Sequence, residues 1–173
     1  MKKTILSILT LLLFIALCLQ VNVNAQSSEK DLDQYELMKQ FVGKWVAETG
    51  EDSTVVWEVI PLNKGYEQII SWKAKEETLR TDKGIIGFTP DGDIGMLFLW
   101  SGDANLSVDI GQFVSENNAT FERYNLNRTH INSIFNYSIN TPDKFVMNWK
   151  WRGTKTTWDD ALVTEWTWTR VME

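Results

Sequence analysis

The chain of 173 residues is poor in the side chains on which many catalytic and metal sites depend. It contains one histidine, His130, and one cysteine, Cys18. These are too few soft ligands for a zinc site built by the protein alone. If Cys18 is removed with a leader peptide, no cysteine–histidine pair remains for nucleophilic catalysis either. We therefore expect no metal site, no cofactor and no catalytic residue.

The sequence also lacks an excess of basic residues. It carries 17 Lys and Arg against 23 Asp and Glu, a formal net charge of −6. A protein that binds the phosphate backbone needs a basic face, so we expect no nucleic-acid partner. We interpret the acidic balance as an aid to solubility. The length is typical of a single domain.

One long hydrophobic run is present, and it lies at the start of the chain. Residues 1–25 combine a basic start, an apolar run over residues 4–19 and a small residue at Ala25. This is the three-part pattern of a secretory signal peptide. The run has about 16 residues, fewer than the ~20 that span a bilayer. We expect residues 26–173 to form one secreted or periplasmic domain without a stable membrane span.

Cys18 keeps a second localisation open. A bacterial lipoprotein would be cleaved before a cysteine and acylated on it, but Leu17 stands where a small residue is expected. We favour a hydrophobic cysteine inside the leader, with the lipoprotein as the minority alternative. A mature chain without cysteine depends on its core alone, and a ~150-residue domain buries enough surface for that.

The mature chain is dominated by alternating apolar residues. Residues 32–42 carry apolar side chains three apart and are followed by Gly43, which predicts a short helix. From Trp45 onward the period becomes two, as in strands with one buried face. The clearest runs are residues 55–60, 66–73, 94–100, 145–152 and 162–171.

Turn-forming residues separate these runs, most clearly at 63–65, 90–93, 115–118, 141–143 and 153–154. The spacing predicts about ten strands joined by short turns. No helix of crossover length lies between strands, which excludes a parallel α/β sheet. Consecutive short turns favour an antiparallel meander, which closes into a barrel when its first and last strands pair. A Greek-key sandwich would need more long connections.

Two short motifs stand where such a barrel would close. The first strand begins Gly43-Lys44-Trp45 directly after the short helix, and the last strand ends Trp166-Thr167-Trp168-Thr169-Arg170. This combination resembles the calycin superfamily, which includes lipocalins and fatty-acid-binding proteins, and is similar to small secreted bacterial lipocalin-like domains of unknown function. The resemblance implies an all-β, calycin-like barrel of about ten strands with a short N-terminal helix. It also implies that Trp45 caps one end of the barrel and that Arg170 packs across it, in a structural role.

The candidate ligand contacts are the residues whose place in the alternating pattern of their strand predicts that they point into the barrel. A ten-stranded barrel can enclose more space than its own side chains fill. The expected apolar lining is Trp57, Trp72, Phe98, Trp100, Phe135, Met147, Trp149 and Trp166, and the expected polar contacts are Gln68, Gln112 and Arg123.

Arg123 is the most informative of these residues. A buried guanidinium needs an acceptor, and a ligand carboxylate would supply two parallel hydrogen bonds. A bulge of one residue would instead turn Arg123 to the surface.

Three functions follow, in decreasing order of support. The first is non-enzymatic binding of a small apolar or amphipathic molecule. The second is a filled-barrel structural or interaction module of the cell envelope, with an exposed apolar patch at Leu97, Leu99 and Phe113. An enzyme ranks last, because no acidic residue has clear inward parity and His130 is expected to be exposed near the barrel rim.

Overall fold

The computed structural model describes residues 32–75, 77–101, 105–125, 131–153 and 157–172. A short helix α2 (Gln34–Met38) and a 3-10 turn η1 (Lys39–Phe41) precede the strands. The strands are β1 (Gly43–Gly50), β2 (Ser53–Leu62), β3 (Gly65–Ala74), β4 (Glu77–Phe88), β5 (Ile94–Trp100), β6 (Asn105–Ser115), β7 (Asn118–Asn125), β8 (Ile131–Thr141), β9 (Lys144–Trp151) and β10 (Leu162–Arg170). The predicted leader, Cys18 and His130 lie outside the described residues.

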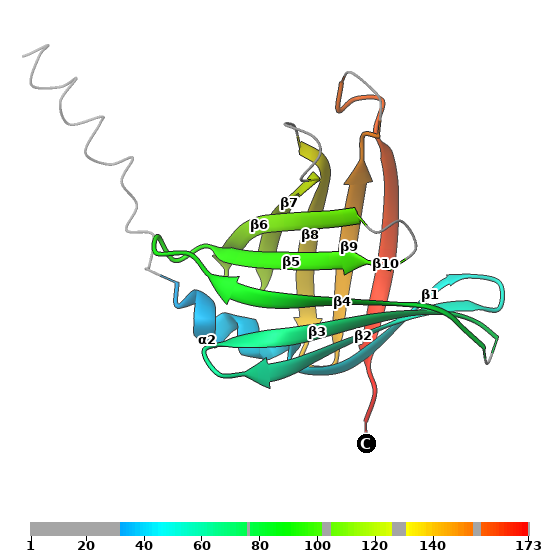
Figure 1. Ribbon diagram of the computed structural model, residues 1–173, viewed down its shortest axis with the longest axis horizontal. Coiled ribbons are helices and arrows are strands. Elements are labelled where there is room, and N and C mark those ends of the chain that lie inside the picture. The colour runs from blue at the N-terminus through cyan, green and yellow to red at the C-terminus, as the bar shows by residue number, and fades with distance from the viewer. Residues whose placement is uncertain (1–31, 76, 102–104, 126–130, 154–156, 173) are drawn as a thin grey trace, which may run out of the picture. The chain divides into compact units, whose positions relative to one another are not determined.

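The ten strands form a closed antiparallel barrel in which every strand pairs with its neighbours in sequence (Figure 1). The ring closes where β1 pairs with β10 as well as with β2, and Trp45 there lies opposite Arg170. This closing pair is short, because only residues 45–47 of β1 pair with residues 168–170 of β10. The predicted all-β barrel with a short helix at its start is confirmed. In the described part of the chain, no helix has the length and apolar character needed to cross a membrane.

Local chemistry explains where the strands end. Four of the five predicted turns fall between β2 and β3, β4 and β5, β6 and β7, and β8 and β9. The fifth begins at Gly153, after β9, and its second residue lies outside the described residues. Asn63 adopts a positive φ of 52° between β2 and β3, and Asp52 adopts 58° between β1 and β2. Asparagine and aspartate tolerate this left-handed region better than most residues, which allows a tight reversal.

The helical segment closes one end of the barrel, called the plugged end below. Met38 and Phe41 are fully buried, and the Phe41 ring lies 5.2 Å from the Phe145 ring and 5.8 Å from the Phe113 ring, centroid to centroid. The side-chain amide of Gln34 fastens the helix to β6, because Phe113 N donates to Gln34 Oε1 at 2.6 Å and Gln34 Nε2 donates to Phe113 O at 3.2 Å. Aromatic rings therefore fill this end of the barrel.

Arg170 lies across the plugged end. Its Cζ is 4.1 Å from the centroid of the Trp45 ring, and its guanidinium donates to three carbonyl oxygens: Gln40 O at 2.9 Å, Val42 O at 2.5 Å and Pro142 O at 3.1 Å. Gly43 has a φ of +115°, and a Cβ built there would lie 2.8 Å from Arg170 Nη1. The glycine of the G-x-W motif thus leaves the space that the arginine occupies.

Candidate functional site: a cavity inside the barrel

Beyond the plugged end the barrel is hollow. The cavity has a volume of about 340 Å³, within the range of about 300–1,000 Å³ typical of small-molecule sites. The following residues expected to point inward line it: Trp57, Gln68, Trp72, Phe98, Trp100, Arg123, Phe135, Met147, Trp149 and Trp166. They come from strands far apart in the sequence, and the period of two along each strand directs them to the same side of the sheet.

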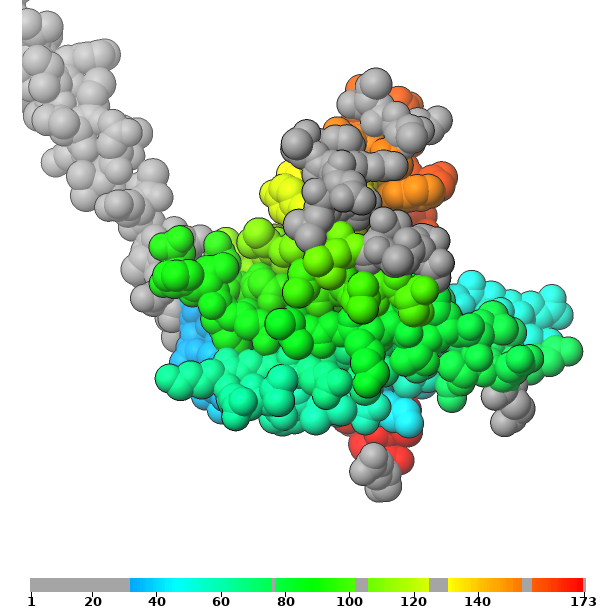
Figure 2. Space-filling view, viewed as in Figure 1, coloured from blue at the N-terminus to red at the C-terminus, as the bar shows by residue number. Residues whose placement is uncertain are grey.

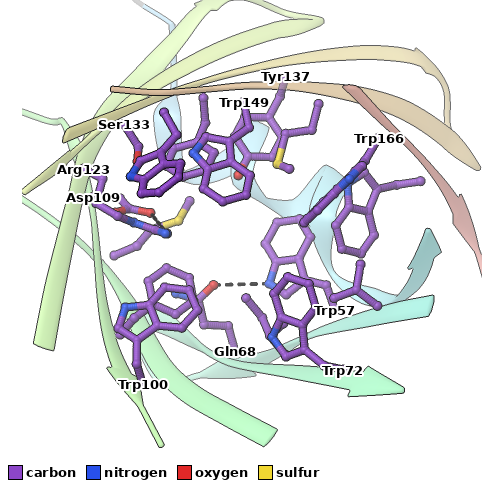
Figure 3. A pocket seen from close by; sticks show the side chains of 18 of the residues that line it. Trp57, Gln68, Trp72, Trp100, Asp109, Arg123, Ser133, Tyr137, Trp149 and Trp166 are labelled. Atoms are coloured by element: carbon purple, nitrogen blue, oxygen red, sulfur yellow. Dashed lines mark hydrogen bonds and ion pairs between the residues drawn. The ribbon is translucent and has the colours of Figure 1, made fainter. Parts of the chain in front are cut away.

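One side of the cavity is a wall of indole rings, called the aromatic wall below. Trp166 lies at its centre, with its ring centroid 5.7 Å from that of Trp72 and 5.9 Å from that of Trp149, both edge to face. Trp57 and Trp168 extend the wall toward the plugged end with an edge-to-face contact of 6.1 Å. Figure 3 shows Trp57, Trp72 and Trp166 together on one side of the central space. Such a wall offers flat apolar surface to a ligand.

The opposite side carries a buried ion pair. Arg123 Nε and Nη2 donate to the two carboxylate oxygens of Asp109, each at 2.7 Å. Asp109 is 3% exposed, and Arg123 Cζ lies 4.5 Å from the Phe135 ring centroid and 4.7 Å from that of Trp100. Figure 3 shows the pair across the cavity from Trp57 and Trp72. The pair is well suited to burial because the bidentate geometry satisfies both charges.

This geometry corrects two expectations. The acceptor of Arg123 is a carboxylate of the same chain, so no ligand carboxylate is needed to satisfy it. The expectation that no acidic residue faces inward is wrong, because Asp109 and Asp82 are both buried among the inward side chains.

Asp82 organises the cavity near the aromatic wall. It is fully buried, and it accepts hydrogen bonds from Trp72 Nε1 at 3.2 Å and from Ser101 N at 2.9 Å and Oγ at 3.0 Å. Arg80 Nε lies 2.8 Å from its Oδ2, and the Arg80 guanidinium stands between the Trp72 and Trp100 rings, 5.2 and 5.5 Å from their centroids. A second internal ion pair is thus present at the cavity.

Several buried polar atoms of the cavity lining have no hydrogen-bond partner among the described residues. They are four donors, Gln68 Nε2, Trp149 Nε1, Trp168 Nε1 and Arg80 Nε, and one acceptor, Asn132 Oδ1. Arg80 Nε forms the ion pair with Asp82 but no hydrogen bond to it. Gln68 is fully buried, and its Oε1 is already occupied by Trp57 Nε1 at 3.2 Å. Buried polar groups nearly always have a partner, so these atoms mark places where a bound molecule or water would be stabilised.

Tyr137 brings a phenol to the same space. Burial raises the pKa of Tyr137, the carboxylate of Asp109 raises it further, and the guanidinium of Arg123 opposes the rise. The phenol therefore stays protonated at neutral pH and adds no charge to the cavity.

Gln112 does not belong to the cavity. It is exposed on the outer face of β6, whereas Ser107, Asp109 and Phe113 of that strand are buried. A bulge between Phe113 and Ser115 shifts the pairing with β7, so that Asp109 and not Ile110 lies opposite Arg123. The inward orientation predicted for Gln112 and the outward orientation predicted for Phe113 are therefore both wrong. The buried face of β6 carries Ser107, Asp109 and Phe113, whereas the apolar Ile110 is 40% exposed, so the apolar period of this strand does not follow its buried face.

Sequence reasoning also missed Arg80, Asn132 and Ser133, because polar residues next to turns give no apolar period to follow. In the described residues, no three side chains of His, Cys, Asp or Glu lie together as a metal site would require. No protein-family model matches this chain, and no curated protein matches it in sequence. The site is therefore judged on its geometry.

Proposed function

We propose that this protein is a non-enzymatic binding protein that holds a small apolar or amphipathic molecule inside its barrel. The observation that carries the proposal is the cavity of about 340 Å³ with one aromatic wall and several buried polar atoms that have no hydrogen-bond partner among the described residues. A wide apolar surface supplies the favourable burial of a ligand, and a few fixed polar groups orient it. In this proposal the ion pairs Asp109–Arg123 and Asp82–Arg80 have a structural role and do not take part in a reaction.

We also propose that the protein acts outside the cytoplasm and is related to the calycins. Residues 1–25 support export, with lipoprotein anchoring at Cys18 as the minority route. The ten-stranded closed barrel and the stacking of Arg170 on Trp45 support the relationship to calycins.

A neutral fluorescent probe, N-phenyl-1-naphthylamine, tests the proposal by titration, because its emission rises when it leaves water. Ser133→Phe places a ring in the cavity, since Ser133 is buried in its lining. Asn136→Phe is the matched control, because Asn136 lies on the same strand and is exposed. We expect the wild type and Asn136→Phe to bind the probe alike, and Ser133→Phe to bind about tenfold more weakly or not at all. Circular dichroism of both variants checks that they are folded.

The alternative is an interaction module that works through its outer surface. Its support is the aliphatic outer face of β4, β5 and β6, on which Ile85 pairs with Leu97 and Leu99 is 56% exposed. The outer surface of β4 and β5 faces the viewer in Figure 2. If the wild type fails to bind the probe, and native mass spectrometry of the protein from its own host shows the bare mass, this alternative takes precedence.

A further inference from the structure

The chemistry of the cavity restricts what kind of molecule it takes, provided that the proposed binding function holds. Three features bear on the choice: the charges of the lining, its unpaired hydrogen-bonding atoms and its aromatic surface. All three belong to side chains held by neighbouring strands of a closed barrel, so they are preorganised before a ligand arrives.

The charges at the cavity are already compensated. Arg123 uses Nε and Nη2 on Asp109, and Arg80 lies 2.8 Å from Asp82. A ligand carboxylate that approached Arg123 would also meet the carboxylate of Asp109, and a ligand ammonium that approached Asp109 would meet the guanidinium. At the Asp109–Arg123 pair neither charged ligand would recover the cost of leaving water, because each of these two charged groups already has its partner.

The unpaired atoms favour a ligand that accepts hydrogen bonds. Gln68 Nε2, Trp149 Nε1 and Trp168 Nε1 can only donate, whereas Asn132 Oδ1 is the one unpaired acceptor in this group. A molecule without acceptors would leave these donors unsatisfied, which costs more than a hydrogen bond contributes.

The aromatic wall favours a flat ring. Trp166 contacts Trp72 and Trp149 edge to face, which leaves ring faces and edges toward the central space (Figure 3). Rings stack on such surfaces with offset or edge-to-face geometry and contribute beyond their buried area.

We infer that the cavity takes an uncharged aromatic compound that carries carbonyl-type hydrogen-bond acceptors, such as an aromatic ketone, ester or lactone, and that it discriminates against organic anions and organic cations of the same size. The ion pairs Asp109–Arg123 and Asp82–Arg80 enforce the charge selection, and the indole and amide donors enforce the preference for acceptors.

Four naphthalene derivatives of equal size test the inference by isothermal titration calorimetry with the purified protein. They are 2-acetylnaphthalene (a neutral acceptor), 2-isopropylnaphthalene (neutral, without acceptor), 2-naphthoate (an anion) and 1-(2-naphthyl)ethylammonium (a cation). We expect the ketone to bind about five- to tenfold more tightly than the hydrocarbon. We expect both ions to bind at least about tenfold more weakly than the ketone.

Two variant pairs assign the effect to its residues. Trp149→Phe removes an unpaired indole N–H, whereas its control Trp100→Phe removes one that Ser107 Oγ already accepts at 2.7 Å. We expect the ketone-to-hydrocarbon ratio to fall in Trp149→Phe and to persist in Trp100→Phe. Asp109→Asn releases the charge of Arg123 and raises the affinity for 2-naphthoate about tenfold, whereas Asp91→Asn in an exposed turn does not.

The outcomes separate the two proposals. If the hydrocarbon binds as tightly as the ketone, water satisfies the donors and the inference is overturned, although the binding function stands. If 2-naphthoate or the ammonium binds most tightly to the wild type, the charge argument is overturned. If none of the four binds and the neutral fluorescent probe does not bind either, the binding function itself fails.

Discussion

Both ends of the barrel interior contain tryptophan and arginine side chains, but among the described residues they differ in whether every indole N–H group has a hydrogen-bond partner. At the plugged end, Trp45 Nε1 donates to Phe41 O at 2.8 Å and Arg170 donates to three carbonyl oxygens. In the cavity, Trp149 Nε1 and Trp168 Nε1 have no partner among the described residues. The difference lies in what crosses the barrel: Met38 and Phe41 of the helical segment fill one end, and the described residues that line the cavity all belong to strands.

Arg170 and Arg123 show the same contrast. Arg170 stacks on one indole and donates to three backbone carbonyls, and its ion pair with the half-exposed Asp143 is longer, at 3.5 Å. Arg123 stacks on Phe135 and Trp100 and is satisfied by a carboxylate on the neighbouring strand. The first arrangement ties together segments that lie far apart in the sequence. The second leaves a charged but neutralised surface beside open space, which is what selection between ligands requires.

The largest expected effect is the difference in the free energy of unfolding when an aromatic side chain is removed from the plugged end or from the cavity. Phe41→Ala removes a fully buried ring that contacts Phe113 and Phe145, and we expect it to lower the free energy of unfolding by about 3–5 kcal/mol. Trp166→Ala enlarges a space that is already open, so we expect a loss of about 2 kcal/mol or less. Urea denaturation followed by circular dichroism measures both. Equal losses would show that the cavity collapses around its lining and is not held open.

The next effect concerns the buried ion pair. Asp109→Ala leaves the guanidinium of Arg123 without its carboxylate, and we expect a loss of about 3 kcal/mol in the free energy of unfolding. The double variant Asp109→Leu with Arg123→Met removes both charges, and we expect it to recover most of that loss. The same denaturation experiment checks the pair. A double variant as unstable as the single one would mean that the pair contributes through its exact hydrogen bonds and not through charge balance.

The smallest effect is the share of one tyrosine, Tyr66, in an alkaline loss of stability. Burial raises the pKa of Tyr66 to about 12. Above pH ~10 the unfolded chain releases the phenol proton while the folded protein keeps it, so stability falls as pH rises from about 10 to 12. The share of Tyr66 amounts to about 1 kcal/mol at pH ~11. We expect Tyr66→Phe to flatten the fall in melting temperature between pH 9 and 11 relative to the wild type. An unchanged slope would assign the alkaline loss to other groups.

Much of the fold could be predicted because it depends on local periodicity. The alternation of Val55, Trp57 and Val59 along β2 predicts one buried face, and all three residues are buried. The helix over residues 32–42 follows from apolar side chains spaced three apart, and α2 with η1 occupies this range. These patterns span several residues, so a single irregularity does not hide them.

The candidate site could be predicted only in part. The aromatic lining follows from the same alternation, and Trp72, Trp149 and Trp166 all line the cavity. The partner of Arg123 could not be found in this way, because a bulge of one residue in β6 exchanges Ile110 for Asp109. No local pattern marks that bulge, since its position depends on how the hairpin of β6 and β7 settles against the rest of the barrel.

The sequence by itself determined an antiparallel meander of about ten strands and the inward face of most of them, because both follow from short-range spacing and turn chemistry. The place where Trp45 and Arg170 close the barrel was implied by the resemblance of the G-x-W motif and the final arginine to a known family. Only the tertiary structure decided that Asp109 neutralises Arg123, that Trp72 meets Trp166 across the wall and that about 340 Å³ stays open. A cavity is the difference between the space a closed barrel encloses and the volume of the side chains that enter it. That difference depends on residues brought together from strands far apart in the chain.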